Sequence, residues 1–171
     1  MDEIKSLNIE QKSKNYFSLK NGRKNIKLKI NKILCPFGLD EEYGNLVFKF
    51  EIDKNNINHI ELIEKIKEFE EKLKSQFQTN NEEWKSLICV RENENIFLET
   101  KVKKMKNNIL TKLTFDDKNK NYLKTIYELN TNFICDLILE IPTLWDFRNN
   151  NNENNENKIG LILNLNNINV Y

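Results

Sequence analysis

Two segments in the first third of the chain alternate between apolar and polar positions. In residues 25–30 the even positions are apolar, with Lys27 and Lys29 between them. Residues 46–52 repeat the pattern, with Leu, Phe, Phe and Ile at every second position. A period of two puts successive side chains on opposite faces of a β-strand. The sequence therefore predicts two half-buried strands, the first with a basic outer face.

After the second of these strands the apolar period lengthens to three or four residues. Asn58 is followed three residues later by Glu61, a pairing typical of a helix N-terminus. The pattern predicts one long amphipathic α-helix near residues 58–78. Its buried stripe would hold Ile60, Ile63, Ile66, Phe69, Leu73 and Phe77.

The second half of the chain returns to strand patterns, in residues 84–90, 96–103, 109–115, 133–141 and 159–171. The tract 149–157 contains only Asn and Glu, so we expect a disordered loop there. Residues 1–24 are polar and Lys-rich and predict a basic arm, either loose or forming a first short strand, ahead of a single domain over 25–171. Six or seven short strands with one inserted helix predict a mainly β (α+β) fold, either a small barrel or a sandwich.

Composition limits the class of protein. The chain has 171 residues, 39% hydrophobic and 31% charged, which fits one polar-surfaced domain with a sizeable core. No run approaches the roughly 18 apolar residues of a membrane helix, and residues 1–5 lack the apolar core of a secretory signal. We therefore expect an intracellular protein without a membrane partner. Because the net charge is only +1, a polyanionic partner would have to bind a local basic patch.

The cysteines predict neither disulfides nor a metal site. Cys35, Cys89 and Cys135 are odd in number, widely spaced and placed in apolar runs. This pattern is typical of reduced, buried thiols in an intracellular protein. His59 is the only histidine, and no local spacing of Cys and His matches a zinc site.

Residues suited to catalysis are few. The four glycines are isolated, so no phosphate-binding loop is present. A nucleophilic mechanism would have to use His59, and a metal-dependent one would need acids such as Asp53, Asp136 and Glu140 in one site. Solvated or structural positions explain these residues better. The sequence predicts a protein that is not an enzyme, with no catalytic residues, no metal and no cofactor.

Charge is segregated along the chain, and this suggests a binding surface. Residues 1–34 carry nine basic and three acidic side chains, and a second basic run begins at Lys101. On one face of the 96–103 strand, Phe97 would stand in a row with Lys101 and Lys103. A groove that binds single-stranded nucleic acid combines such lysines, which contact phosphates, with aromatic rings on which bases stack. The predicted phosphate contacts are Lys27, Lys29, Lys101, Lys103 and Lys104, and the predicted stacking residues are Phe97, Trp84 and Trp145.

The same residues have a simpler interpretation. Surface lysines are ordinary, Phe97 could be covered by a loop, and Trp84 and Trp145 could belong to the core or its edge. A non-catalytic protein-interaction or virion-structural β-domain is then the alternative function. Its interface would include Val47 and Ile162, two apolar residues that the alternation places outside.

Several short motifs occur in an order that resembles a known family. The Lys-alternating strand leads to Pro36-Phe37-Gly38-Leu39 and then Tyr43-Gly44, and a late strand runs into Leu144-Trp145-Asp146-Phe147. This order resembles the single-stranded DNA-binding proteins of giant nucleocytoplasmic DNA viruses, which are similar to the short-tailed coliphage single-stranded DNA-binding protein. The resemblance covers about residues 25–171.

The resemblance implies an OB-like barrel that carries a helix and binds single-stranded DNA, without sequence preference, in DNA replication or recombination. It implies replication proteins and a second copy of the chain as further partners, and a location in the host cytoplasm, a viral factory or the nucleus. The chain ends in Asn167-Ile168-Asn169-Val170-Tyr171, without the acidic tail of the coliphage protein. RNA stays open as a ligand, because stacking and phosphate contacts serve both nucleic acids.

Overall fold

The structure is a computed structural model. It describes residue 4 and residues 6–42, 44–91, 93–105, 108–117, 120–122, 126–148 and 158–171. The loop expected at 149–157 lies outside the described residues.

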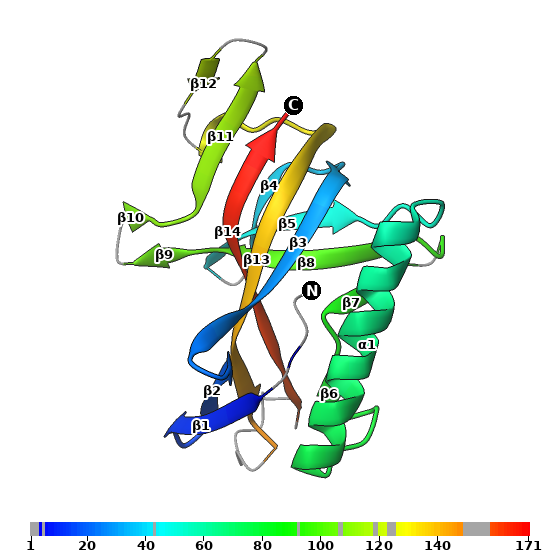
Figure 1. Cartoon of the computed structure of the whole chain (residues 1–171), viewed down its shortest axis with the longest axis vertical. Coiled ribbons are helices and arrows are strands. Elements are labelled where there is room, and N and C mark those ends of the chain that lie inside the picture. Colours follow the sequence, from blue (N-terminus) through cyan, green and yellow to red (C-terminus); the bar gives the residue numbers. More distant parts are fainter. Residues whose placement is uncertain are drawn as a thin grey trace.

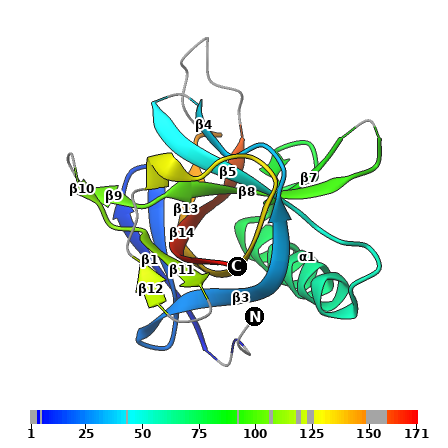
Figure 2. The same ribbon diagram turned by 90° about the horizontal axis from the view of Figure 1, so that it is seen from above.

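Five strands form the central barrel (Figures 1 and 2). In the order in which they pair they are β3 (Lys24–Cys35), β5 (Asn45–Glu51), β8 (Ile96–Val102), β14 (Ile159–Val170) and β13 (Phe133–Asp146). β13 then pairs with β3, which closes the circuit. β8 and β14 are parallel, and the other neighbours are antiparallel. Five strands closed in this way form an OB-like barrel, so the predicted fold class is confirmed.

The inner face of the barrel is the core, as the alternation predicts. Leu28 on β3, Leu139 on β13 and Leu165 on β14 have no exposed surface. Phe48 and Phe50, on the predicted inner face of β5, are also fully buried. Val47 departs from the alternation, because it is only 1% exposed although it lies on the opposite face. The short strand β4 (Leu39–Glu42) pairs with β5 there and places Asp40 opposite Val47.

The predicted helix is α1 (Ile57–Phe77), which lies along the outside of the barrel (Figure 1). Its N-cap is Asn56, whose side chain accepts a hydrogen bond from the Asn58 N–H at 3.0 Å. The buried stripe contains Ile63, Ile66, Phe69 and Leu73, as expected, together with His59, Leu62 and Glu70. Ile60 was expected in this stripe but is 39% exposed.

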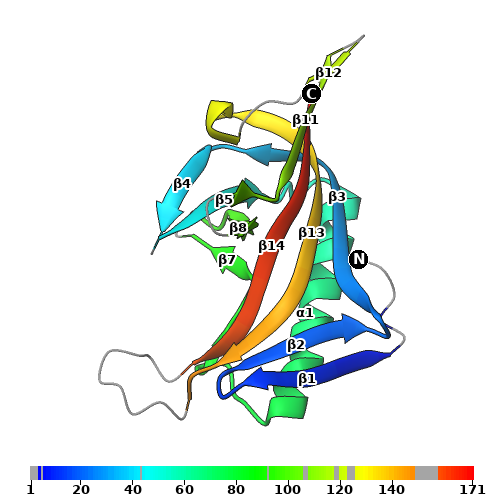
Figure 3. The same cartoon turned by 90° about the vertical axis from the view of Figure 1, so that its left-hand side faces the viewer.

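The described part of the N-terminal segment forms two strands. β1 (Leu7–Ser13) and β2 (Tyr16–Asn21) form an antiparallel pair, and β2 continues the sheet by pairing with β13. Leu19 is fully buried and belongs to the core. Figure 3 shows the pair β1–β2 at the lower end of the long strands β13 and β14.

The remaining elements are short. They are β6 (Trp84–Lys85), β7 (Ile88–Val90), β9 (Lys104–Met105), β10 (Asn108–Ile109), β11 (Lys112–Asp117), β12 (Lys120–Tyr122) and the 3₁₀ helix η1 (Ile126–Glu128). β6 and β11 pair with β14, and β7 pairs with β8. Within the described part of the chain, no helix is both long and apolar enough to cross a membrane.

The histidine has a structural environment. His59 is 1% exposed. Its Nδ1 accepts the Asp53 N–H at 3.2 Å, and its Nε2 lies 2.9 Å from the carbonyl oxygen of Asn31. The neutral ring with its proton on Nε2 satisfies both contacts. His59 therefore joins the start of α1 to β3.

The cysteines are free thiols. Cys35 and Cys135 are buried as expected, and burial raises the pKa of Cys35 to about 11. Cys89 is only half-buried, which corrects the expectation for this residue. Among the described residues, no group of three or more His, Cys, Asp or Glu side chains is arranged to hold a metal ion.

Candidate nucleic-acid interface

A groove of about 520 Å³ lies between the β6–β7–β8 side of the barrel and the adjoining ends of β13 and β14. Two of the predicted binding residues, Lys101 and Trp145, line it. The complete lining is Tyr16, Lys85, Ser86, Leu87, Cys89, Glu99, Lys101, Trp145, Phe147, Lys158, Leu161, Ile162 and Leu163. The groove therefore collects residues from six strands and the segments between them.

One wall of the groove is aromatic. The rings of Trp145 and Phe147 are 5.5 Å apart between centroids and tilted by 39°. Tyr16 meets Phe147 edge-on at 5.7 Å and is itself 41% exposed. The cross-strand pair of Trp145 with Tyr16 brings β2 to this wall. Half-exposed rings that support one another in this way offer flat apolar faces to a ligand.

Gly160 allows the strands to approach closely behind this wall. A Cβ atom at Gly160 would lie 2.8 Å from Cζ2 of Trp145 and 3.1 Å from Cβ of Lys85. Real carbon atoms do not approach so closely, so a larger residue would displace the indole. The glycine thus sets the position of Trp145 relative to β6 and β14.

Lysines provide the charge of the groove. Lys85 belongs to β6 and Lys101 to β8, and Lys158 directly precedes β14. Glu99 is the acidic residue of the lining. Three lysines and three aromatic rings on one concave surface form the combination that binds the phosphates and bases of a single strand.

Phe97 lies on the same face of β8 as Lys101, as the alternation predicts, but it is not accessible. It is only 3% exposed because the ring of Phe37 covers it at 5.7 Å. The Arg91 guanidinium lies 4.7 Å from the Phe37 ring and 5.0 Å from that of Phe97. Phe37 is 46% exposed, so on this face it is accessible where Phe97 was expected to be.

The sequence pattern does not predict the exposed position of Phe37, although Phe37 belongs to a motif of the family resemblance. Phe37 belongs to the Pro36-Phe37-Gly38-Leu39 turn, in which Gly38 has a φ of +71°. Such a turn reverses the chain beyond β3. Nothing in the local sequence shows that the turn folds onto β8, about 60 residues later.

Trp84 is a core residue. It is 6% exposed and does not line the groove. The structure therefore does not give Trp84 the surface position that base stacking needs. The next residue of β6, Lys85, lines the groove instead, because neighbouring residues of a strand face opposite sides.

The other predicted lysines lie outside the groove. Lys27 and Lys103 both contact the carboxylate of Glu140, at 3.7 Å and 3.3 Å. Lys29 is exposed on β3. The Lys104 ammonium donates to the carbonyl oxygen of Gly44 at 3.2 Å. Among the five predicted lysines, the structure brings only Lys101 together with the aromatic wall.

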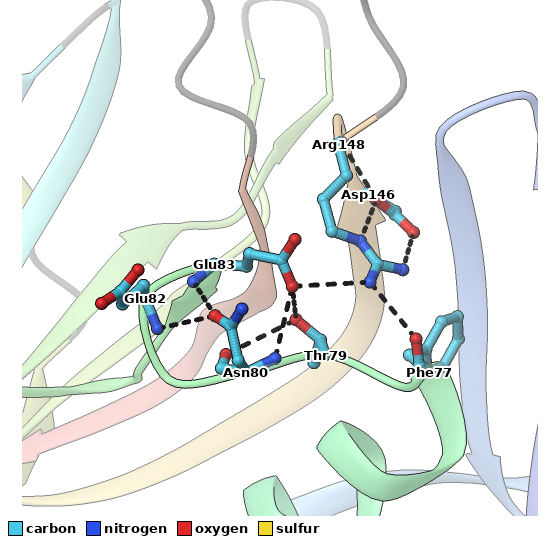
Figure 4. A network of polar contacts seen from close by, with 7 residues as sticks. All are labelled: Phe77, Thr79, Asn80, Glu82, Glu83, Asp146 and Arg148. Atoms are coloured by element: carbon cyan, nitrogen blue, oxygen red, sulfur yellow. Dashed lines mark hydrogen bonds and ion pairs between the residues drawn. The ribbon is translucent and has the colours of Figure 1, made fainter.

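A polar network joins Asp146 and Arg148, which flank Phe147 in the chain, to the end of α1 and the segment after it (Figure 4). The Arg148 guanidinium donates to both carboxylate oxygens of Asp146, at 3.0 Å and 2.7 Å. It also donates to the carbonyl oxygen of Phe77, the last residue of α1, at 3.3 Å and lies 3.9 Å from Glu83. Burial raises the pKa of Asp146, but its hydrogen bonds and ion pair with Arg148 outweigh this effect and leave the pKa below its usual value.

Glu70 supports another part of the lining. This carboxylate of α1 is 3% exposed and accepts hydrogen bonds from the Ser86 hydroxyl and the Leu87 N–H, both at 2.7 Å. Ser86 and Leu87 line the groove. Burial raises the pKa of Glu70, and the two hydrogen bonds oppose the shift without cancelling it.

Comparison with known proteins shows similarity at the level of structure. No family model matches the sequence, and a search of curated proteins finds no match. The single-stranded DNA-binding protein of bacteriophage Enc34, solved in complex with ssDNA, superposes with a TM-score of 0.52 and 13% identity, covering 98% of this chain and 96% of that one.

A second structure of the Enc34 protein, with a C-terminal truncation, gives a TM-score of 0.55 and 12% identity. It covers 96% of this chain and 94% of the other. The two superpositions establish a shared fold over nearly the whole length. At identities this low they show the fold alone. Membership of the giant-virus family stays a prediction.

Proposed function

We propose that this protein binds single-stranded DNA without sequence preference, through the groove between β8 and the ends of β13 and β14. The observation that carries the proposal is the convergence of Tyr16, Trp145 and Phe147 with Lys85 and Lys101 on one concave face of an OB-like barrel. Aromatic faces accept any base, and lysines contact phosphates, so neither contact reads sequence. The Enc34 protein with the same fold was solved with ssDNA, which supports the choice of ligand.

The outer face of β8 extends the site beyond the groove. Glu99 of the lining lies on this face of β8, and Cys89 of the neighbouring strand β7 is paired with Phe97. Phe97 itself is covered by Phe37. A strand leaving the aromatic wall along β8 would therefore reach the exposed ring of Phe37. The faces of OB-type barrels that bind oligonucleotides combine such a strand surface with the adjacent loops.

The arrangement favours a single strand over a duplex. Bases can stack on the Trp145 wall only when they are not paired inside a double helix. We infer a non-catalytic role in DNA replication or recombination, in which exposed strands are covered. Each proposed phosphate contact releases counterions, so the affinity should decrease as salt is raised.

Oligonucleotide binding, measured by fluorescence anisotropy across a salt series, tests the proposal. The double variant K85A/K101A should weaken binding of every mixed-sequence single strand. It should also reduce the magnitude of the slope of log K against log salt by about 1.4, or about 0.7 for each lost contact. The variant K65A, at an exposed position of α1, removes a lysine that does not line the groove and is the control for each lost charge.

Different results would overturn the binding site and the function. Unchanged affinity of K85A/K101A, with wild-type binding intact, would overturn the groove as the site. Absence of binding by the wild-type protein at low salt would overturn the function and favour a protein-interaction domain. The structure does not favour that alternative, because Val47 is buried and Ile162 lines the groove.

A further inference from the structure

A row of side chains crosses four strands of the barrel on its outer face. Lys101 on β8 is paired with Asn164 on β14, and Asn164 with Glu140 on β13. Glu140 is in turn paired with Lys27 on β3. Directly opposed residues of neighbouring strands lie on the same face of a sheet. The row therefore connects the groove, through Lys101, to the basic outer face of β3.

Glu140 lies in the middle of a cluster of positive charge. Its Oε1 is 3.7 Å from the Lys27 ammonium, and its Oε2 is 3.3 Å from that of Lys103. Asn166 approaches Oε1 at 3.5 Å. The carboxylate side chain is 5% exposed, whereas the side chains of Lys27 and Lys103 are 44% and 36% exposed. Solvent and ligands can thus reach the two ammonium groups, while the acid stays beneath them.

We propose that Glu140 lowers the affinity of the protein for single-stranded DNA by holding Lys27 and Lys103 in an internal ion cluster next to the binding groove. The inference rests on the proposed function and extends it, because it assigns an affinity-limiting residue to the same site. Lys27 and Lys103 would then act as a reserve of positive charge, half of which is neutralised by Glu140 in the wild-type protein.

Charge balance is the physical reason. One carboxylate beside two ammonium groups leaves a net charge of +1 where the two lysines alone would carry +2. A phosphate that approaches Lys27 must compete with a carboxylate already in contact and shielded from water. Because both lysines are exposed, removal of the acid would leave hydrated cations rather than a buried unpaired charge, which is the costly outcome in ion pairs.

The variant E140Q should therefore bind single strands more tightly than the wild-type protein. Each lysine that turns from Glu140 to a phosphate adds about 0.7 to the magnitude of the slope of log K against log salt. This corresponds to roughly fivefold tighter binding at 0.1 M salt for each new contact, a gain that disappears near 1 M. Anisotropy titrations of a mixed-sequence oligonucleotide at several salt concentrations measure both quantities.

The matched control is E64Q, which makes the same change of charge at an exposed position of α1, where Glu64 pairs with Lys67 at 3.3 Å. E64Q should leave the affinity and the slope close to those of the wild-type protein. Equal gains in E140Q and E64Q would mean that net charge, and not the cluster, is responsible, and would overturn the inference. Unchanged or weaker binding by folded E140Q would also overturn it.

A double-mutant cycle with K27Q locates the effect. In the wild-type background K27Q should change the affinity less than twofold, because Lys27 is occupied by Glu140. In the E140Q background the same change should cost about fivefold at 0.1 M salt. Equal effects of K27Q in both backgrounds would contradict the inference.

Failure of the variant to fold has to be separated from failure of the inference. A thermal melt shows whether E140Q is folded, and E140L offers a second way to remove the charge, because apolar residues often replace buried ionic groups without loss of stability. Loss of binding in K85A/K101A together with unchanged binding in E140Q and E140L would retain the proposed function and reject the role of Glu140. No binding by any protein, wild type included, would reject both.

Discussion

At the scale of the residue, buried and partly buried charged groups position the lining of the groove. Glu70 holds Ser86 and Leu87, and Arg148 holds Asp146 next to Trp145. Each charged group is hydrogen-bonded, which is the usual condition for its burial. The Glu70 contact does not follow from the local sequence, since Glu70 and Leu87 are 17 residues apart, whereas Asp146 and Arg148 are close neighbours in the chain.

Glu70 should make stability depend on pH. Burial raises the pKa of Glu70 in the folded protein above its usual value of 4.5, so the contribution of this group to stability is full below that pH. It is lost progressively as the pH rises through the raised pKa, because ionisation is easier in the unfolded chain. Urea unfolding of wild type and E70Q between about pH 4 and pH 7 measures the difference.

E70Q can keep the hydrogen bond from the Leu87 N–H but does not titrate. The decrease in stability with rising pH should therefore be smaller in E70Q than in the wild-type protein. The exposed variant E68Q is a control in the same helix. Identical pH profiles of wild type and E70Q would show that Glu70 does not ionise in this range.

At the scale of the element, the end of α1 is fastened to the end of β13. The carbonyl oxygen of Phe77 and the carboxylate of Asp146 share the Arg148 guanidinium. Backbone hydrogen bonds hold the same part of the chain. The Asp146 N–H donates to the carbonyl oxygen of Asn15 and the Phe147 N–H to that of Lys158, both at 2.9 Å. These contacts set the direction in which Trp145 and Phe147 face the groove.

The variant R148Q should destabilise the fold by roughly 1.5–3 kcal/mol, the range for a hydrogen bond to a charged group. It leaves the Asp146 carboxylate, whose side chain is 14% exposed, without its cation. Single-strand binding should weaken as well, because the aromatic wall loses its support. Urea unfolding and anisotropy on the same sample measure both effects.

A double variant shows whether R148Q acts through its ion pair with Asp146. The double variant D146N/R148Q should be less destabilised than the sum of its two single variants, because the pair is already broken in each. K67Q, on the exposed face of α1, is the control. Additive losses would mean that Arg148 acts mainly through Phe77 and Glu83.

At the scale of the whole molecule, the barrel separates its three cysteines by their accessibility. Cys35 and Cys135 have no exposed surface, whereas Cys89 is half-buried and lines the groove. Burial, and next the charge of Glu99, raise the pKa of Cys89. Alkylation of this thiol should therefore be slow at neutral pH and faster at alkaline pH.

Single-stranded DNA in the groove should protect Cys89 from alkylation. At a free oligonucleotide concentration of ten times Kd, the rate should decrease about tenfold, in proportion to the remaining free protein. Mass spectrometry of the modified peptide measures the rate, and a duplex of the same sequence should protect much less. C89S should remain largely unlabelled under native conditions. Full labelling of Cys89 in a saturated complex would place the DNA outside the groove.

The sequence by itself determined the periodic part of this protein. Alternation identified β3, β5, β8, β13 and β14, and the longer period identified α1, because each period reports which side of an element is buried. The order of motifs led to the OB-like class. Of the residues that line the groove, the sequence predicts Lys101 and Trp145, because lysines and aromatic residues near strand ends can be recognised from the sequence alone.

Tertiary structure alone decided which of these residues are accessible and what they contact. Periodicity assigned Phe97 to the outer face but could not show that Phe37 covers it. It placed Lys27 and Lys103 on outer faces but could not show that Glu140 lies between them. Tyr16 lies in the groove because β2 pairs with β13, which no local pattern shows. Such contacts join residues far apart in the chain, and the pattern within one segment carries no information about which other segment packs against it.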